Sequence, residues 1–276
     1  TIESKQKRGY RFMKTTEQLL PWEISPGLKT KYIGKRIYYF EEIDSTQNFA
    51  LQIAQNKKEN GTIVIGQKQT NGKGRLNRKW VSSKGGIWFS IILHPKFTIE
   101  ESVLLPIVAA VSLSSAIKKT LNLETNVKWP NDITLNGKKV AGILIDTSIV
   151  SNKIEQMVIG VGINFKIKPN ELINSIKKTP NFYGVTTLTK KNETVLPLIQ
   201  QFLQELENVF RLINTRRIKK IKEEWNKRSS TIGKNISVIT DDGNLHGKAI
   251  KIDNEGGLII SKGKTTKRIL VGDVKE

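Results

Sequence analysis

The sequence contains no cysteine and only two histidines, His94 and His246, in 276 residues. The absence of cysteine excludes disulfides, a thiolate nucleophile and any cysteine-ligated metal. Two histidines also argue against a multi-histidine metal site. No apolar run approaches the roughly 20 residues that a membrane-spanning helix needs, and there is no signal-peptide segment. We therefore expect a cytoplasmic protein.

Acidic residues are scarce as well: 25 of them oppose 46 basic residues, which gives a net charge of +21. This excess implies a polyanionic or acidic partner, such as nucleic acid, nucleotide phosphates or an acidic protein. The alternative is a composition that is rich in lysine everywhere. The cations are spread along the chain, with one denser run over 211–228, and this favours general basicity over a single nucleic-acid-binding stripe.

The hydrophobic pattern predicts a mixed α and β chain. We expect strands over 36–40, 61–67, 86–93, 126–129, 132–146 and 157–165, with an Asn136-Gly137 hairpin turn. Helices are expected after a cap at Ser45 or Thr46, over 106–119 and over 192–211. From residue 231 onward, four short β-like runs alternate with turn signals, which is typical of a small β-barrel.

A basic, glycine-containing stretch, TNGKGRLNRKW at 70–80, is the first candidate for a binding site. It does not match a P-loop, because Lys73 is followed by Gly74 and not by Ser or Thr, and the glycine spacing is wrong. It does not match a dinucleotide fingerprint, because no helix pattern follows. Gly72 and Gly74 permit close backbone approach and positive φ. The stretch is therefore either an anion-binding loop or a solvated surface loop.

Four further motifs surround this loop in the sequence: DST at 44–46, KWPND at 128–132, KKVAGIL at 138–144 and GVGIN at 160–164. Together with the loop, and in this order, they resemble the biotin protein ligases. The resemblance covers about residues 36–276. Single motifs are weak, since a Trp-Pro-Asn-Asp turn or a surface lysine would be unremarkable, but five in the right order are specific.

The resemblance implies an α+β fold: a class II aminoacyl-tRNA-synthetase-like, biotinyl/lipoyl ligase catalytic domain with a mixed sheet flanked by helices, followed by an SH3-like β-barrel. The implied domains are residues 36–228 and 229–276. Residues 1–35 are expected to be a linker. Within it, RGYRF at 8–12 is similar to the end of the winged-helix domain that bifunctional members carry, so we expect only a stump of such a domain and no DNA binding by this chain.

The implied reaction has two steps. Biotin's carboxylate attacks the α-phosphate of MgATP to give biotinyl-5′-adenylate and pyrophosphate, and a lysine of a carboxylase's biotin carboxyl carrier domain then displaces AMP. No protein nucleophile is needed, in agreement with the lack of cysteine. The protein must instead hold two anions together and offset their charge.

The resemblance assigns roles to residues of this sequence. Lys139 and Arg75 are the expected catalytic residues, with Lys139 bridging the carboxylate and the α-phosphate, and Asp132 is an expected magnesium contact. The expected biotin-binding residues are Ser45, Thr46, Gln47, Gln69, Gly72, Lys73, Gly74, Arg75, Lys139, Gly142 and Gly160. The expected ATP-binding residues are Arg75, Arg78, Trp80, Lys128, Asn131, Lys139 and Asn164.

The loop departs from the family's usual G-R-G-R-x-G-R pattern at two positions. Lys73 replaces the first arginine, which keeps the charge but loses the bidentate fork. Asn77 replaces the third glycine, and asparagine tolerates a left-handed backbone better than most residues. Two other functions remain open at this point: a lipoate–protein ligase, which shares the fold and the adenylating chemistry, and a nucleic-acid-binding module. Many members dimerise through an edge strand, and a homodimer is a further possibility here.

Overall fold

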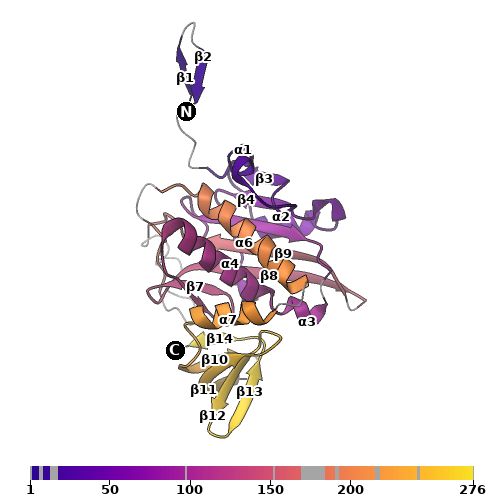
Figure 1. Cartoon of the computed structure of the whole chain (residues 1–276), viewed down its shortest axis with the longest axis vertical. Coiled ribbons are helices and arrows are strands. Elements are labelled where there is room, and N and C mark those ends of the chain that lie inside the picture. The colour runs from indigo at the N-terminus through magenta and orange to yellow at the C-terminus, as the bar shows by residue number, and fades with distance from the viewer. Residues whose placement is uncertain are drawn as a thin grey trace.

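The computed structural model describes residues 2–275 apart from 6–8, 13–17, 97, 152, 169–183, 190–192, 215–217 and 241–242. Two β-sheets dominate it, a large one that follows residue 36 and a small one at the C-terminal end of the chain (Figure 1). None of the helices in these ranges is long and apolar enough to cross a membrane.

The large sheet has seven strands in the order β3-β4-β5-β9-β8-β7-β6. β3 and β4 are parallel, and every other neighbouring pair is antiparallel, so the sheet is mixed as expected. β5 is buried along its whole length, which explains why it is apolar at every position except Ser90 and does not alternate. The strands are β3 (Ile37–Phe40), β4 (Ile63–Gly66), β5 (Ile87–Leu93), β6 (Asn126–Lys128), β7 (Asp132–Leu135), β8 (Lys138–Val150) and β9 (Lys153–Ile163).

Helices cover the two faces of this sheet unequally. The long helices α4 (Leu105–Leu121) and α6 (Leu196–Asn214) lie side by side across one face and complete the main hydrophobic core with it (Figure 1). On the other face, α2 (Thr46–Ile53) buries Ala50 and Ala54 against Val64, Ile92 and Val158. The part of this second face that α2 does not cover holds the cavity described below.

Local signals account for the helix ends. The Ser45 hydroxyl accepts a hydrogen bond from the Asn48 N–H at 3.4 Å and so caps α2, as the sequence predicts. α4 has Pro106 in its first turn, and its C-cap is Asn122, whose φ of 53° is left-handed. α7 (Ile218–Arg228) was not predicted, because its cations obscured the helical spacing of Ile221 and Trp225, both of which are buried.

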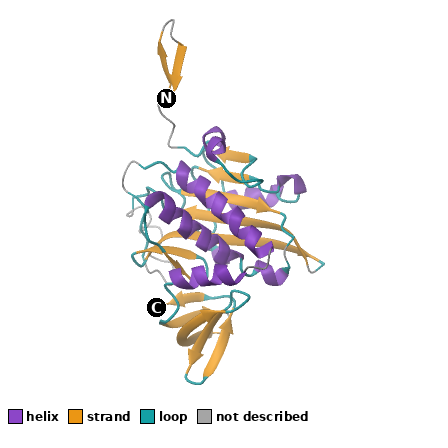
Figure 2. Cartoon of the chain, in the orientation of Figure 1, coloured by secondary structure: helices purple, strands orange, loops and turns teal. Residues whose placement is uncertain are grey.

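The C-terminal sheet has five described strands in the order β13-β12-β11-β10-β14, all antiparallel (Figure 2). No described hydrogen-bond pairing joins the edge strands β13 and β14, so the expected SH3-like barrel closure is not confirmed. The sequence also predicted four strands and missed the short β14. The strands are β10 (Asn235–Thr240), β11 (Gly243–Ile252), β12 (Leu258–Lys262), β13 (Thr265–Ile269) and β14 (Asp273–Lys275).

The N-terminal residues form a small antiparallel hairpin of β1 (Ile2–Lys5) and β2 (Gly9–Phe12), which stands apart from the rest in Figure 1. Four of the five RGYRF residues lie in β2, and Arg8 is outside the described residues. The remaining described elements are two short α-helices, α1 (Pro21–Ile24) and α3 (Ile99–Ser102), and three short 3-10 helices, η1 (Ser25–Gly27), η2 (Lys57–Glu59) and η3 (Arg75–Asn77).

A buried carboxylate ties α6 to the segment before β3. Glu207 is 6% exposed. Its carboxylate accepts backbone N–H groups from Lys31, Tyr32 and Ile33 at 2.6, 3.1 and 3.1 Å. Burial, together with the Glu207 charge, raises the pKa of the Tyr32 phenol to about 12. The carboxylate therefore satisfies three backbone donors of a segment that has no strand partner.

We expect Glu207→Ala to lower the free energy of unfolding by about 2–4 kcal/mol, because it leaves buried backbone donors without an acceptor. Glu207→Gln keeps one oxygen and should lose less. Urea unfolding of the purified chain measures the difference, with the exposed Glu223→Ala as the matched control. Equal stabilities for the Glu207→Ala and Glu223→Ala variants would contradict this role of the Glu207 carboxylate.

Candidate functional site

Three glycines hollow out one face of the large sheet. Gly162 pairs with Trp88 on one side and Gly142 on the other, and Gly160 pairs with Ser90 and Leu144. Because side chains alternate along a strand, all these residues point to the same face. The missing side chains leave a depression at the centre of strands β5, β9 and β8.

Two side chains from other elements enter this depression. A Cβ on Gly160 would lie 2.5 Å from Oε1 of Gln47. A Cβ on Gly162 would lie 2.5 Å from Nε1 of Trp80, and one on Gly142 would lie 3.0 Å from the same indole ring. Gly142 and Gly160 are expected biotin-binding residues, and the space directly in front of them admits Trp80 and Gln47.

A cavity of about 180 Å³ lies over this face. Every predicted site residue except Gly72 lines it, so motifs from distant parts of the sequence meet at one place. Its lining includes Ser45, Thr46, Gln47, Gln69, Lys73, Gly74, Arg75, Arg78, Trp80, Lys128, Asn131, Asp132, Lys139, Gly142, Gly160 and Asn164.

The glycine loop is an ordered, hairpin-like turn over the cavity. The Trp80 N–H donates to the Gly72 carbonyl at 2.8 Å, and the Gly74 N–H donates to the Arg78 carbonyl at 2.7 Å. Gly72 lies behind the cavity wall, where a Cβ would meet the Trp80 carbonyl at 2.5 Å. The close approach of the Trp80 backbone thus explains the glycine at position 72. The left-handed backbone occurs instead at the tip of the turn, where φ is 54° for Leu76 and 53° for Asn77.

Lys139 lines the cavity and contacts both a carboxylate and an aromatic ring there. Its Nζ lies 2.6 Å from Oδ1 of Asp132 and 5.1 Å from the centre of the Trp80 ring. The indole packs edge-on against Trp88, with the rings 6.3 Å apart. The lysine is thereby held by one carboxylate and one aromatic face, and its ammonium points into the cavity.

The KWPND motif forms the opposite wall. Lys128 is buried at the end of β6, and the Trp129–Pro130 bond is cis. The Trp129 backbone N–H donates to Thr231 Oγ1 at 3.1 Å and its indole N–H to the Gly256 carbonyl at 3.3 Å. The motif therefore also joins the large sheet to the start of the C-terminal region.

Two buried polar atoms on the wall have no hydrogen-bond partner among the described residues: Nε1 of Trp80 and Oδ1 of Asn164. The Asn164 amide nitrogen donates to the Thr186 carbonyl at 3.2 Å, which fixes the direction of the free oxygen. A buried polar atom without a partner is costly in a folded protein. One donor and one acceptor are therefore available to a ligand here.

A row of hydroxyl and amide groups forms the uncharged end of the cavity. Oε1 of Gln69 accepts from the Thr46 backbone N–H at 2.8 Å, and Nε2 of Gln69 donates to the Ser82 hydroxyl at 2.7 Å. The Thr46 and Ser90 hydroxyls lie 3.0 Å apart. This end suits a neutral polar group with both donors and acceptors.

The C-terminal sheet supplies a wall residue that sequence reasoning missed. Asp273, the first residue of β14, lines the cavity and forms an ion pair with Arg78. Nη1 of Arg75 lies 3.3 Å from Oδ1 of Asn131 and 3.5 Å from the Gly272 carbonyl. Both loop arginines are therefore held by groups outside the loop.

The pKa values of the two arginines follow from these contacts. Burial lowers the pKa of Arg75, and the nearby charges of Asp273 and Asp132 oppose this. The hydrogen bond to Asp273 raises the pKa of Arg78.

Six cations line the cavity with only two acidic residues, and the site is therefore suited to an anion.

The expected magnesium contact, Asp132, is engaged with Lys139. The described histidine, aspartate and glutamate side chains form no group of three or more that could hold a metal. Mg²⁺ commonly binds to one or two carboxylates together with substrate phosphates. The residues present fit an ion that arrives with a nucleotide, and they do not form a metal cage of their own.

Comparison with known proteins agrees with this geometry. Residues 39–164 match the model of the biotin/lipoate A/B protein ligase family, and residues 231–275 match that of the biotin protein ligase C-terminal domain. The bifunctional ligase/repressor BirA of Bacillus subtilis is 34% identical, over 99% of this chain and 84% of that protein. The biotin–[acetyl-CoA-carboxylase] ligase of Paracoccus denitrificans is 29% identical, over 79% of this chain and 90% of that protein.

The structure resembles the biotin protein ligase of Aquifex aeolicus in complex with biotin and ATP, with a TM-score of 0.71 and 28% sequence identity. The alignment covers 87% of this chain and 98% of that one. The sequence match over nearly the whole chain, the two family models and the shared fold lead to one conclusion. The chain belongs to the biotin protein ligases of the biotin/lipoate A/B protein ligase family.

Proposed function

We propose that this chain is an ATP-dependent biotin protein ligase, which forms biotinyl-5′-adenylate and then transfers biotin to a lysine of a biotin carboxyl carrier domain. The observation that carries the proposal is the convergence of all five motifs on one cavity, which Lys139 lines together with Asp132 and the other cations. The relatives named as biotin ligases support it.

The cavity's two ends suit the two substrates. The hydroxyl and amide groups of Ser45, Thr46 and Gln69 match the ureido head of biotin, which has two N–H donors and one carbonyl. Arg75, Arg78 and the other cations match the triphosphate of ATP. The biotin carboxylate then meets the α-phosphate near Lys139.

In the first step, a carboxylate oxygen of biotin attacks the α-phosphorus and the bond to pyrophosphate breaks. Both reactants are anions, so the reaction requires their repulsion to be offset and their positions fixed. Lys139 is suited to contact the carboxylate and the phosphate together, exchanging its contact with Asp132 for them. In the second step, an acceptor lysine attacks the acyl carbon and AMP leaves.

The position of the glycine loop suits it to protect the intermediate. A mixed anhydride is hydrolysed by water, so a ligase must cover it until the acceptor arrives. The loop over 70–80 lies across the cavity, and its Trp80 fills the glycine depression. We propose that this loop is the lid over the adenylate.

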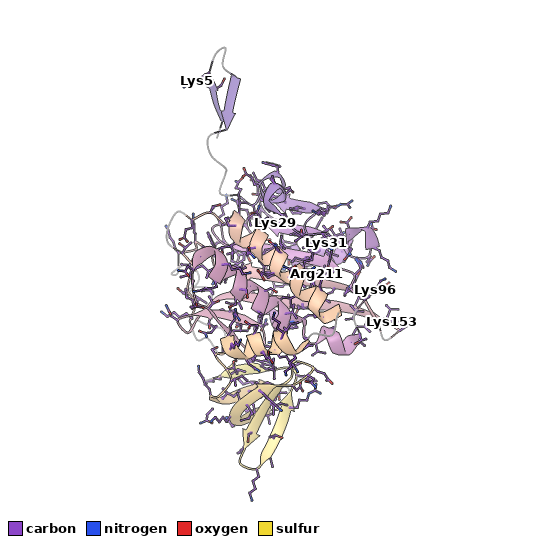
Figure 3. All side chains as sticks on the ribbon, viewed as in Figure 1. Lys5, Lys29, Lys31, Lys96, Lys153 and Arg211 are labelled. Carbon is purple, nitrogen blue, oxygen red and sulfur yellow. The ribbon has the colours of Figure 1, made fainter. Side chains whose placement is uncertain are left out.

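The other functions considered are less well supported. A lipoate ligase would share the first family model, but residues 231–275 match the biotin protein ligase C-terminal domain, which favours biotin. Competition of lipoate with biotin in the same assay separates the two. The cations labelled in Figure 3, such as Lys29, Lys96 and Lys153, come from separate segments of the chain. A nucleic-acid-binding module predicts tight DNA or RNA binding that weakens steeply with salt, and weak binding at modest salt would reject it. Homodimer formation remains a prediction.

Biotin-dependent exchange between ATP and pyrophosphate tests the function and Lys139 together. We expect exchange with the wild type and a loss of at least about 100-fold with Lys139→Ala, the scale of removing one donor that stabilises transition-state charge. Lys138→Ala, at the exposed neighbouring position, is the control and should stay near wild type. Absence of exchange with the wild type would reject the ligase, and full exchange with Lys139→Ala would reject the role of Lys139.

Asp273→Ala should raise the KM for ATP about fivefold and leave the KM for biotin unchanged. The ion pair holds Arg78 ready for the phosphates, and that preorganisation is lost. Removing the negative charge of Asp273 should by itself favour binding of the ATP phosphates, but this effect is small because six cations already line the cavity. Steady-state exchange kinetics measure both constants, with the exposed Lys275→Ala as the control. A lower KM for ATP would contradict this prediction, because it would show that repulsion between the Asp273 carboxylate and the phosphates outweighs the positioning of Arg78.

Transfer to the carrier domain should be more sensitive to salt than adenylate formation. An acidic acceptor meets this basic protein by diffusion, so screening slows the encounter, whereas charges inside the cavity are screened less. Single-turnover transfer from preformed adenylate should slow by about tenfold between 0.05 and 0.5 M NaCl, as for other steered encounters. An equal salt dependence of both steps would contradict this use of the net charge.

A further inference from the structure

A continuous series of buried and partly buried hydrogen bonds runs from strand β8 into the uncharged end of the cavity. Nε2 of Gln47 donates to Oδ2 of Asp146 at 2.8 Å, and the Ser90 hydroxyl donates to Oε1 of Gln47 at 2.9 Å. The Ser90 hydroxyl is 3.0 Å from that of Thr46, which is 3.1 Å from Oε1 of Gln69. Asp146 begins this series and does not itself line the cavity.

Asp146 occupies a position where the sheet otherwise has apolar residues. It pairs with Val158, which in turn pairs with Ile92, and both are fully buried under α2. Along β8 it follows Gly142 and Leu144 on the face of the cavity. A carboxylate at the edge of an apolar row costs solvation free energy, and here a directed hydrogen bond offsets that cost.

Asp146 fixes which way the Gln47 amide points. A carboxylate and a carbonyl can only accept, and Nε2 of Gln47 meets both: Asp146 at 2.8 Å and the Val158 carbonyl at 3.2 Å. The amide oxygen must then face Ser90. Gln47 is 3% exposed, and glycine at 160 is what makes room for its oxygen.

This orientation determines where the hydroxyl protons lie. The Ser90 proton is used on Gln47, so Ser90 can only accept from other partners. The Thr46 proton is used on Ser90 or Gln69. Both hydroxyls are left with lone pairs and no spare proton. These two hydroxyls therefore present acceptors, which complement the N–H groups of a cyclic urea.

We propose that Asp146 is a positioning residue for biotin: through Gln47 it sets the polarity of the Ser90 and Thr46 hydroxyls that receive the ureido N–H groups. The proposal rests on the proposed function and adds a residue outside the cavity to it. Asp146 contacts neither substrate. It acts on recognition of the head group and has no part in the chemistry at Lys139.

The test compares exchange kinetics of Asp146→Ala with those of the wild type. We expect the KM for biotin to rise about tenfold, the scale of one lost hydrogen bond to a charged group, with kcat and the KM for ATP unchanged. Asp146→Asn retains an acceptor oxygen and should restore the KM for biotin to within about threefold. Thr147→Ala, exposed on the opposite face of β8, is the matched control.

A double-mutant cycle isolates the connection through Gln47. In a Gln47→Ala background, Asp146→Ala should add no further increase in the KM for biotin, because the amide that it orients is gone. If Asp146→Ala does not fold, Asp146→Thr preserves strand propensity and volume without reaching the amide, and the same results are expected.

Three outcomes would overturn the proposal: an unchanged KM for biotin, an equal loss against biotin and ATP, or additive effects of the two substitutions. Failure of the proposed function gives a different result, since the wild type would then show no biotin-dependent exchange at all.

Discussion

The site depends on the absence of side chains at three adjacent sheet positions. Gly142, Gly160 and Gly162 lie side by side on strands β8 and β9, and they remove the layer of side chains that would normally cover a central sheet. The space admits the Trp80 indole and the Gln47 amide. The indole lies beneath the Lys139 ammonium among the charged groups of the cavity, and the amide lies at its uncharged end. A Cβ at position 160 or 162 would lie only 2.5 Å from Gln47 or Trp80. Glycine at these positions is therefore required for the loop and α2 to pack against the sheet as they do.

The arginines of the loop are held from a different part of the chain. Asp273 is nearly 200 residues away in sequence, yet its carboxylate binds Arg78 while Asn131 and Gly272 bind Arg75. The KWPND motif reinforces this junction through Trp129, which donates to Thr231 and Gly256. The C-terminal sheet is thus part of the site, and the loop is ordered by contacts that only the folded chain provides.

Sequence patterns predicted the local features well and the long-range ones poorly. The strand positions, the Ser45 cap and the Asn136-Gly137 turn follow from short-range periodicity and turn chemistry. The motif residues were found through their resemblance to a family. Asp273 was missed because a three-residue strand has no periodic signal, and Asp146 was missed because its role depends on which strands pair. Spacing along the chain does not contain that information.

The two departures of the loop from its family's pattern differ in consequence. Asn77 has a φ of 53°, so a left-handed backbone is what the third glycine of the usual pattern accommodates, and asparagine adopts it at little cost. Leu76 has nearly the same φ, and for a leucine this conformation costs about 1–2 kcal/mol. The contacts of Arg75 and Arg78 on either side offset that cost. The turn therefore persists because its flanking arginines are anchored, which makes loop geometry and anion binding inseparable in this protein.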